Sequence, residues 1–365
     1  MDIGICTFVL LLLMASSSRS QSVVLDVTKH ATISVGEITE ALIATWKEAC
    51  ASTSSSKILI PKGTYKLKQV NLRGPCNAPI EIQVDGTIEA PADLTQLDGK
   101  YQWIIFGYFD FFTLSGVGTF DGLGEVAWKQ NGCGKNKNCN MLSMNFGFYF
   151  LNNSIIKGIT SKDSKYFHVN VFGCKNLTFM DFSATAPATS PNRDGSKQIT
   201  ILNVTCGPGH GISVGSLGKY SNEEPLEYIT VRNCTLRNTD NGLRIKTWPT
   251  TPITYDLVSN LHFENIIMDN VSNPVIIIDQ DKVTFKDITG TSATQNGVVL
   301  ICSSGVPCEE VVLSNIDSHS MELVSMLHVP TLNQIFWAMH LNVKLRKPGF
   351  DLFCFYSIVC LLCTY

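Results

Sequence analysis

Tyr228-Ile-Thr-Val-Arg-Asn-Cys234 is one copy of a pattern that recurs along the middle of this chain. Lys282-Val-Thr-Phe-Lys-Asp-Ile288 is a second copy, with apolar residues at the same alternate positions. The same frame fits Asn153-Ser-Ile-Ile-Lys-Gly-Ile159, Asn176-Leu-Thr-Phe-Met-Asp-Phe182, Gln198-Ile-Thr-Ile-Leu-Asn-Val204, Asn260-Leu-His-Phe-Glu-Asn-Ile266 and Glu310-Val-Val-Leu-Ser-Asn-Ile316. The sixth residue of each copy, in chain order, is Gly158, Asp181, Asn203, Asn233, Asn265, Asp287 or Asn315.

Each copy reads as a short strand, a turn residue and the start of a second strand. Alternating apolar residues indicate a strand, and Asn or Asp tolerates the left-handed backbone of a tight turn. The copies recur every ~22 to 32 residues, which is a solenoid period. The pattern therefore predicts an all-β parallel β-helix, in which each coil stacks on the next. The strands of a β-sandwich, the rival fold, do not repeat one heptapeptide in a fixed frame.

The N-terminal part of the chain carries a different pattern. Residues 37–52 place Ile38, Ala41, Leu42, Trp46 and Ala49 on one face of a helix. We expect this helix to cap the first coil, because an open solenoid end exposes apolar surface and strand edges. The segment 58–65 is expected to begin the coils.

The net charge of the chain bears on its possible partners, and its first residues bear on its compartment. The 365 residues carry a net charge of −3, and the pI is near 6.2, which does not suggest a nucleic-acid partner. Residues 1–20 read as a secretory signal, although their only charge before the apolar run is Asp2. The alternative is a buried N-terminal helix.

Cysteines and glycosylation sequons also suit a secreted protein. The chain has 13 cysteines, a number that fits an oxidising compartment. Plausible disulfides are Cys50–Cys76, Cys133–Cys139 and Cys302–Cys308. The N-glycosylation sequons begin at Asn152, Asn176, Asn203, Asn233 and Asn270. No cysteine or histidine spacing argues for a metal, and we expect no cofactor.

Two further segments carry the chemistry. Cys206-Gly-Pro-Gly-His-Gly211 places His210 between glycines, and Asn241-Gly-Leu-Arg-Ile-Lys246 places two basic residues on one strand face. Alone, Arg244 and Lys246 would be an ordinary solvated face. With these segments the chain resembles the polygalacturonases, glycoside hydrolase family 28, and most of all the plant exopolygalacturonase type, from about Val23 to about Asp317.

The resemblance implies a right-handed β-helix that hydrolyses homogalacturonan in the plant cell wall by inverting acid–base chemistry, acting from chain ends. Such a reaction needs one carboxyl to protonate the leaving oxygen and another to activate water. By resemblance, Asp194 shares the base role and His210 assists the acid. The resemblance also implies that Asn192, in the same motif as Asp194, binds the substrate, and that Arg244 and Lys246 bind the galacturonate carboxylate. The expected partner is homogalacturonan or an oligogalacturonate, bound by a monomer without a stable membrane span.

The chain departs from the family where the chemistry is concentrated. The family's Asn-Thr-Asp motif is Asn192-Arg193-Asp194 here, and its Asp-Asp pair is absent. Asp194 and His210 are only 16 positions apart, less than one coil of ~22 residues. We infer that about a coil is missing, that the strands there shift register or bulge, and that Cys206 is a free thiol or pairs differently from the family.

Two more departures have the same character. A family loop that contains a tyrosine is missing at Gln280–Asp281, and residues after Asp317 leave the family pattern. Read one frame over, that tail can spell a family-like C-terminus, so we interpret it as frameshifted. The domains are therefore a signal at 1–20, a β-helix at 21–317 and a divergent tail at 318–365. The alternatives to an impaired enzyme are a non-catalytic pectin-binding β-helix and an unproductive gene model.

Overall fold

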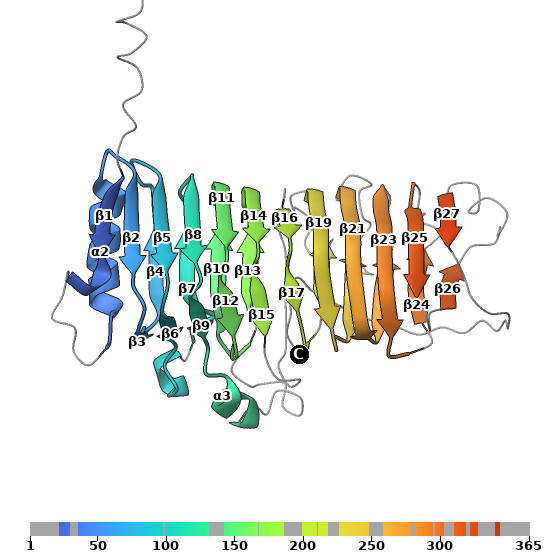
Figure 1. The fold of residues 1–365 in the computed structure, drawn as a ribbon, viewed down its shortest axis with the longest axis horizontal. Helices are drawn as coiled ribbons and strands as arrows, with labels where there is room; N and C mark the ends of the chain where they lie inside the picture. The colour runs from blue at the N-terminus through green and yellow to red at the C-terminus, as the bar shows by residue number, and fades with distance from the viewer. Residues whose placement is uncertain are drawn as a thin grey trace, which may run out of the picture.

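The computed structural model describes a long stack of parallel strands with a helix at its N-terminal end (Figure 1). It describes residues 22–29, 36–97, 99–130, 142–166, 168–185, 199–209, 211–217, 226–247, 258–278, 282–294, 296–302, 310–318, 322–327 and 340–343. Within these ranges, a few side chains, including that of Lys246, are not described.

The strands form three columns, each holding one strand from successive coils. The first column runs β1 (Val23–Asp26), β2 (Ser56–Ile60), β5 (Ile80–Val84), β8 (Phe112–Gly116), β11 (Asn152–Lys157), β14 (Lys175–Met180), β16 (Ile199–Leu202), β19 (Leu226–Arg237), β21 (Val258–Val271), β23 (Val283–Ser292), β25 (Val312–Ser318) and β27 (His340–Val343). The second column runs β3 (Thr64–Lys66), β6 (Thr87–Glu89), β9 (Thr119–Asp121), β12 (Thr160–Lys162), β15 (Ser183–Thr185) and β17 (Thr205–Cys206), and then joins β19.

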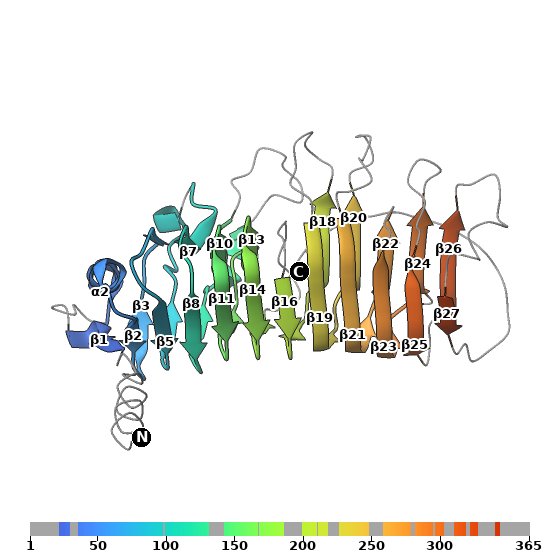
Figure 2. The same ribbon diagram turned by 90° about the horizontal axis from the view of Figure 1, so that it is seen from above.

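The third column lies opposite the first (Figure 2). Its first sheet holds β4 (Val70–Arg73), β7 (Gln102–Gly107), β10 (Met144–Tyr149) and β13 (Val169–Phe172). Its second sheet holds β18 (Ile212–Leu217), β20 (Asn241–Thr247), β22 (Asn273–Ile278), β24 (Asn296–Cys302) and β26 (Glu322–Leu327). The remaining elements are α2 (Thr39–Ala51), α3 (Glu125–Gln130), η1 (Val27–Lys29) and η2 (Leu94–Leu97).

Neighbouring strands within these columns pair in parallel, coil upon coil. For example, Ile229 of β19 pairs with Leu261 of β21, which pairs with Val283 of β23. Between the columns the chain turns and the inward side chains meet in one core. The predicted all-β parallel β-helix with an N-terminal capping helix is confirmed.

The sixth residue of each copy of the repeat forms a left-handed turn. All seven sixth-position residues have a positive φ, from 52° at Asp181 to 72° at Gly158. This confirms the predicted left-handed turn, which Gly, Asn and Asp adopt at least cost. The first residue of the repeat is also left-handed in six copies, including Tyr228, Lys282 and Glu310, whose φ values are 60°, 52° and 54°. Three of these six residues are asparagines, Asn153, Asn176 and Asn260, yet no turn was predicted at this position.

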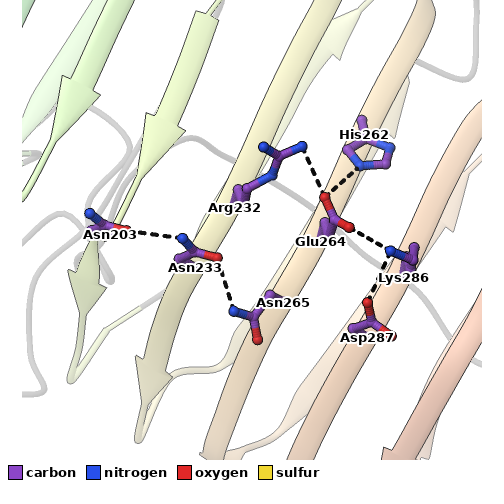
Figure 3. Close-up of polar contacts among 8 residues, drawn as sticks. All are labelled: Asn203, Arg232, Asn233, His262, Glu264, Asn265, Lys286 and Asp287. Atoms are coloured by element: carbon purple, nitrogen blue, oxygen red, sulfur yellow. Dashed lines mark hydrogen bonds and ion pairs between the residues drawn. The ribbon is translucent and has the colours of Figure 1, made fainter.

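Asparagine side chains link the coils on the outside of the stack (Figure 3). The Nδ2 of Asn233 donates to the Oδ1 of Asn203 at 3.2 Å, and the Nδ2 of Asn265 donates to the Oδ1 of Asn233 at 2.9 Å. Asn203 in turn donates to Asp181 at 3.0 Å. The sixth-position Asn residues thus serve both the turn and a ladder of hydrogen bonds along the molecule.

The core is built from aligned inward side chains. Phe263 and Phe285 stack at 4.7 Å between ring centroids, with an angle of 8° between their planes. Phe106 and Phe148 stack in the same way at 5.5 Å. Equivalent positions in successive coils therefore bury equivalent residues, which is how a solenoid forms a continuous core.

Helix α2 covers the N-terminal end of the stack, as predicted. It buries Ala41, Leu42, Trp46 and Ala49, and the indole of Trp46 lies 5.0 Å from the ring of Phe109. The predicted disulfide between Cys50 and Cys76 is present and joins the helix to the loop after β4. The first coil begins earlier than predicted, because β1 pairs with β2 ahead of residue 58.

The strands flanking the inferred excision are in regular register. Leu177 to Met180 of β14 pair in unbroken order with β16, whose residues 200–202 pair in unbroken order with β19. The first and second columns therefore close up across the join without the expected register shift. The third column is interrupted between β13 and β18, and β18 pairs with β20 through an irregularity between Val214 and Leu217. Cys206 is disulfide-bonded, so the expectation of a free thiol was wrong, and the alternative of another pairing remains.

Other expectations lie outside the described residues. These are the secretory signal, the Cys133–Cys139 and Cys302–Cys308 disulfides, and most of the tail. Within that tail, β26 and β27 pair with β24 and β25. The domain boundary at Asp317 was drawn from family resemblance and stays a prediction. In the part of the chain that is described, no helix is long and apolar enough to cross a membrane.

Candidate functional site

One predicted site residue, Arg244, is described with its side chain. Asn192, Asp194 and His210 lie outside the described residues, and Lys246 is described only in its backbone, as part of β20. The structure therefore does not test whether the five residues come together. What it does describe is the strand pair β18–β20 and the segments that enter these strands.

The β18–β20 register gives Arg244 a neighbour that sequence reasoning missed. Ser213 of β18 is the partner of Arg244, and Ile276 of β22 flanks the arginine on the other side. Ser213 lies three residues after His210 in the chain, so the motif around the histidine also supplies the residue beside the arginine. The parallel stacking of the two motifs could have indicated this pairing.

Arg244 is not on a solvated strand face. Leu243 and Ile245 point into the core, so alternation turns Arg244 outward, yet its side chain is only 1% exposed. A buried guanidinium is costly unless other groups compensate its charge. An ordinary solvated face therefore does not describe this position, and a ligand carboxylate could contact the guanidinium only once it becomes accessible.

The glycines around position 210 bring two backbones into close contact. A Cβ on Gly207, whose φ is 120°, would lie 1.9 Å from the carbonyl oxygen of Arg237. A Cβ on Gly211, whose φ is 87°, would lie 1.8 Å from the carbonyl oxygen of Asn241. Between them, the amide of Asp240 donates to the carbonyl of Gly209 at 2.7 Å. The glycines of this motif therefore hold the chain against the segment that leads into β20.

Two other histidines, His168 and His262, have structural surroundings, and no function was predicted for them. His168 is fully buried, with Nδ1 2.8 Å from the Oγ of Ser161, and burial lowers its pKa to about 3. His262 contacts Glu264 on the outside of β21. His30 lies outside the described residues. Among the described side chains, no group of three or more His, Cys, Asp or Glu could hold a metal.

Comparison with known proteins places the chain in a family. The sequence model "Glycosyl hydrolases family 28" matches residues 50–197, 193–282 and 278–331. A polygalacturonase of Medicago sativa is 50% identical over an alignment that covers 84% of this chain and 84% of that protein. The chain belongs to glycosyl hydrolase family 28. An exopolygalacturonase of Oenothera organensis is 43% identical to this family 28 chain, covering 76% of it and 89% of the relative.

Solved structures agree on the fold of this family 28 chain. The polygalacturonase from Erwinia carotovora ssp. carotovora matches with a TM-score of 0.57 and 16% identity, covering 84% of this chain and 97% of the other. The endo-xylogalacturonan hydrolase from Aspergillus tubingensis gives 0.57 and 18% identity, covering 83% and 98%.

The family match comes in three pieces, and the positions of the joins are informative. The pieces meet at residues 193–197 and 278–282. These are the two places where the sequence predicted missing segments, after Asp194 and at Gln280–Asp281. The catalytic assignments of Asp194 and His210 themselves stay predictions.

Proposed function

We propose that this family 28 chain acts on the α-1,4-galacturonosyl bonds of homogalacturonan in the cell wall, outside the cell, and that it derives from an exo-acting enzyme. The observation that carries the proposal is the identity of 50% and 43% to proteins named polygalacturonase and exopolygalacturonase. The glycine-flanked His210 and the paired Arg244 and Lys246 add support, because a basic site suits a polyanionic substrate.

We further propose that hydrolysis by this chain is impaired. The Asp-Asp pair that would supply the acid and part of the base is missing, and the family match is divided at that point. Losing a general acid or base slows a reaction by ~10²–10⁴-fold per group. Asp194 keeps one carboxyl, but its neighbour Arg193 would lower its basicity if the two side chains pair.

Reducing-sugar release from polygalacturonate tests this proposal. The Medicago sativa relative, purified and assayed in parallel, is the control. We expect this chain to be slower by at least ~10²-fold. A rate close to that of the relative would refute the impairment and would assign the missing carboxyls to residues not considered above.

We propose that Arg244 and Lys246 still bind oligogalacturonate. Guanidinium and ammonium groups bind carboxylates, and such contacts weaken as salt rises. Calorimetric titration with trigalacturonate should show binding that fades with salt and is lost in the Arg244→Ala, Lys246→Ala variant. Arg237→Ala removes one positive charge from an arginine that is 60% exposed and is the control for loss of charge elsewhere on the protein. Arg244→Lys keeps the positive charge at this position and removes the guanidinium. The affinity of this variant shows whether a cation alone is sufficient for binding.

Equal affinity of the double variant and the parent would reject this binding site. The alternative class is a non-catalytic pectin-binding β-helix. It is favoured because the chain keeps the basic residues Arg244 and Lys246 but lacks the Asp-Asp pair that acid–base catalysis needs. Binding without any measurable hydrolysis would support that alternative. Sequencing the transcript decides the third reading, because a message that restores the Asp-Asp segment would return the chain to an ordinary enzyme.

A further inference from the structure

The asparagine amides of all five glycosylation sequons take part in hydrogen bonds between coils. In each, Nδ2 donates to an Oδ1 of the preceding coil, at a distance between 2.8 and 3.2 Å. The donor–acceptor pairs are Asn152–Asp110, Asn176–Asn153, Asn203–Asp181, Asn233–Asn203 and Asn270–Asn238. By these contacts alone the five sequons are equivalent, and other features of the structure distinguish them.

Asn152 differs from the other four. Asn176, Asn203, Asn233 and Asn270 have φ values of 54–57°, whereas Asn152 is not among the left-handed residues. The register partner of Asn152 in the next coil is Lys175 of β14. No amide side chain therefore continues the ladder of hydrogen bonds at this position.

The residue two positions before each sequon asparagine also separates Asn152 from the other four. Before Asn152 this residue is Phe150, which is 40% exposed. Before the others the residues are buried: Cys174, Ile201, Val231 and Met268. Asn152 is therefore the sequon asparagine with an exposed aromatic ring beside it.

Phe150 belongs to an aromatic platform on the surface, formed by Tyr108, Phe150 and Phe172 in successive coils. The rings of Tyr108 and Phe150 stack at 5.0 Å with 26° between their planes, and Phe172 meets Phe150 edge-on at 5.5 Å. Tyr108 is 47% and Phe172 53% exposed. Exposed aromatic clusters of this kind mark surfaces that a partner covers.

The backbone under the platform carries strain that packing in the core does not explain. Tyr108 and Phe150 have φ values of 66° and 52°, which are unfavourable for bulky residues. At the equivalent position of the next coil stands Gly173, where an added Cβ would lie 2.5 Å from the Phe150 ring. The chain thus keeps large rings at strained, exposed positions and a glycine that makes room for one of them.

We propose that Asn152 carries an N-linked glycan whose first N-acetylglucosamine packs on the Phe150 and Tyr108 rings. Tyr108 lies between Phe150 and the guanidinium of Arg73, so the rings offer their apolar edges to the C–H groups of a sugar. Phe150 precedes the attachment point by two residues in the chain. Tyr108 lies beside Phe150 on the coil that also holds Asp110, the hydrogen-bond partner of Asn152. The occupant of the platform is therefore a segment that the protein itself carries.

The transfer is chemically consistent with the fold. A lipid-linked diphosphate oligosaccharide of the secretory pathway is the donor. The Nδ2–C1 bond forms, the C1–O bond to the diphosphate breaks, the lipid diphosphate leaves, and one Nδ2 proton is lost to base. Nδ2 begins with two hydrogens, so the glycosylated amide keeps one N–H for Asp110.

Glycosylation must precede folding of this coil. The Ser154 hydroxyl of the sequon is fully buried, donates to the carbonyl of Asn152 at 2.9 Å and accepts from the amide of Phe112 at 3.2 Å. A transferase could read that hydroxyl only in the unfolded chain. The folded protein then places the attached sugar on the aromatic platform.

The test is glycopeptide mass spectrometry on the full chain secreted from a plant-cell host, combined with a thermal double-mutant cycle. We expect Asn152 to be occupied. Phe150→Ala should lower the unfolding midpoint by roughly 2–4 °C more in the parent than in the Asn152→Gln background. Tyr228→Ala removes another exposed left-handed ring, which is 54% exposed, and Asn270→Gln removes another sequon; neither should show this coupling.

An unoccupied Asn152, or an equal Phe150→Ala shift in the two backgrounds, would overturn the proposal. If Asn152 is unoccupied and Phe150→Ala abolishes retention on immobilised polygalacturonate, the platform binds a polysaccharide instead of the chain's own glycan. If Asn152 is occupied but its glycan is uncoupled from Phe150, the sugar does not pack on the rings and that part of the proposal fails.

Discussion

At the scale of the residue, Asn233 combines two tasks that are usually separate. Its backbone is left-handed, with a φ of 57°, and its side chain both donates to Asn203 and accepts from Asn265. Asn suits both tasks, because its short amide tolerates this backbone and can donate and accept at once. The side chain therefore joins three coils at the point where each coil turns.

Substitutions of Asn233 should separate the two tasks. Asn233→Asp keeps the acceptor and the tolerance of a left-handed backbone, and should cost about 1 kcal/mol for one lost hydrogen bond. Asn233→Ala loses both bonds and adds about 1–2 kcal/mol of backbone cost. Urea unfolding of protein made in a host that does not N-glycosylate would measure both. Equal losses in the two variants would show that neither the left-handed turn nor the second hydrogen bond contributes measurably to stability.

Glu264 contacts a lysine, an arginine and a histidine from three strands on the outside of the stack (Figure 3). Its carboxylate lies 2.6 Å from Lys286, 2.9 Å from Arg232 and 3.3 Å from His262. The hydrogen bond from Lys286, followed by that from His262, lowers the pKa of Glu264 to about 2. The charged form is therefore favoured in the folded protein relative to the unfolded chain.

This lowered pKa has a consequence for acid stability. An unfolded glutamate titrates near pH ~4.3, so the stabilisation from Glu264 is complete above that pH and is lost as the pH falls towards about 2. Glu264→Gln cannot titrate. The unfolding midpoint of the parent should exceed that of Glu264→Gln at pH ~6, and the difference should shrink between pH ~4.5 and ~2. Glu40→Gln, on the exposed side of α2, is the control; a constant Glu264 difference would contradict the prediction.

Residue by residue, the sequence predicted one of the two turn positions in the repeat. The sixth residue was predictable because Gly, Asn and Asp are the residues that adopt a left-handed backbone readily. The first residue was not, because Tyr228, Lys282 and Glu310 have no such preference. There the stacking of adjacent coils imposes the conformation, and no local sequence pattern reports it.

At the scale of the element, β16 and β17 are short strands of 4 and 2 residues. The next strand, β19, has 12 residues and pairs with both of them, and β21 after it has 14. In a solenoid each coil is stabilised by its interfaces with its neighbours, so short strands give a weak coil. The regular register of β16 and β17 removes one predicted source of weakness in this coil. The small number of residues that these strands pair remains a second source.

Amide exchange should reveal this weakness. We expect faster exchange, and earlier proteolysis, between Ser190 and Gly211 than in the coils around Asn233 and Asn265. Local opening should be easiest where few hydrogen bonds and few apolar contacts must break. Hydrogen–deuterium exchange followed by mass spectrometry compares these peptides in one experiment. Uniform protection would mean that the disulfide of Cys206 and the continuous core fully restore the coil.

The elements themselves were predicted unevenly. Helical periodicity placed α2 within a residue or two of its observed bounds, because its buried face is a strong local signal. Strand β1 was missed, since Val23–Asp26 is short and pairs with β2 only through a distant stretch of chain. Its place is determined by the open edge of the first coil, which a local pattern does not show.

At the scale of the whole molecule, the repeat was enough to predict the architecture. It was not enough to predict the burial and the neighbours of Arg244 in the candidate site. A fixed frame of alternating residues determines how coils stack, whatever the loops do. The burial of Arg244 depends on chain segments far from β20 in sequence, so its neighbours Leu243 and Ile245 gave no hint of it. Ser213 was missed for a related reason, because its meeting with Arg244 depends on the register between two coils.

The direction of the strand pairing has a mechanical consequence. Hydrogen bonds between parallel strands run roughly across the strands, so here they run along the length of the rod (Figure 1). Tension between the two ends would load the coil interfaces in series and peel them apart instead of shearing them. The interfaces of β16 and β17 would part first, while α2, fastened by Cys50 and Cys76, would stay with the first coils. The tensile strength of the rod is thus set by its shortest strands.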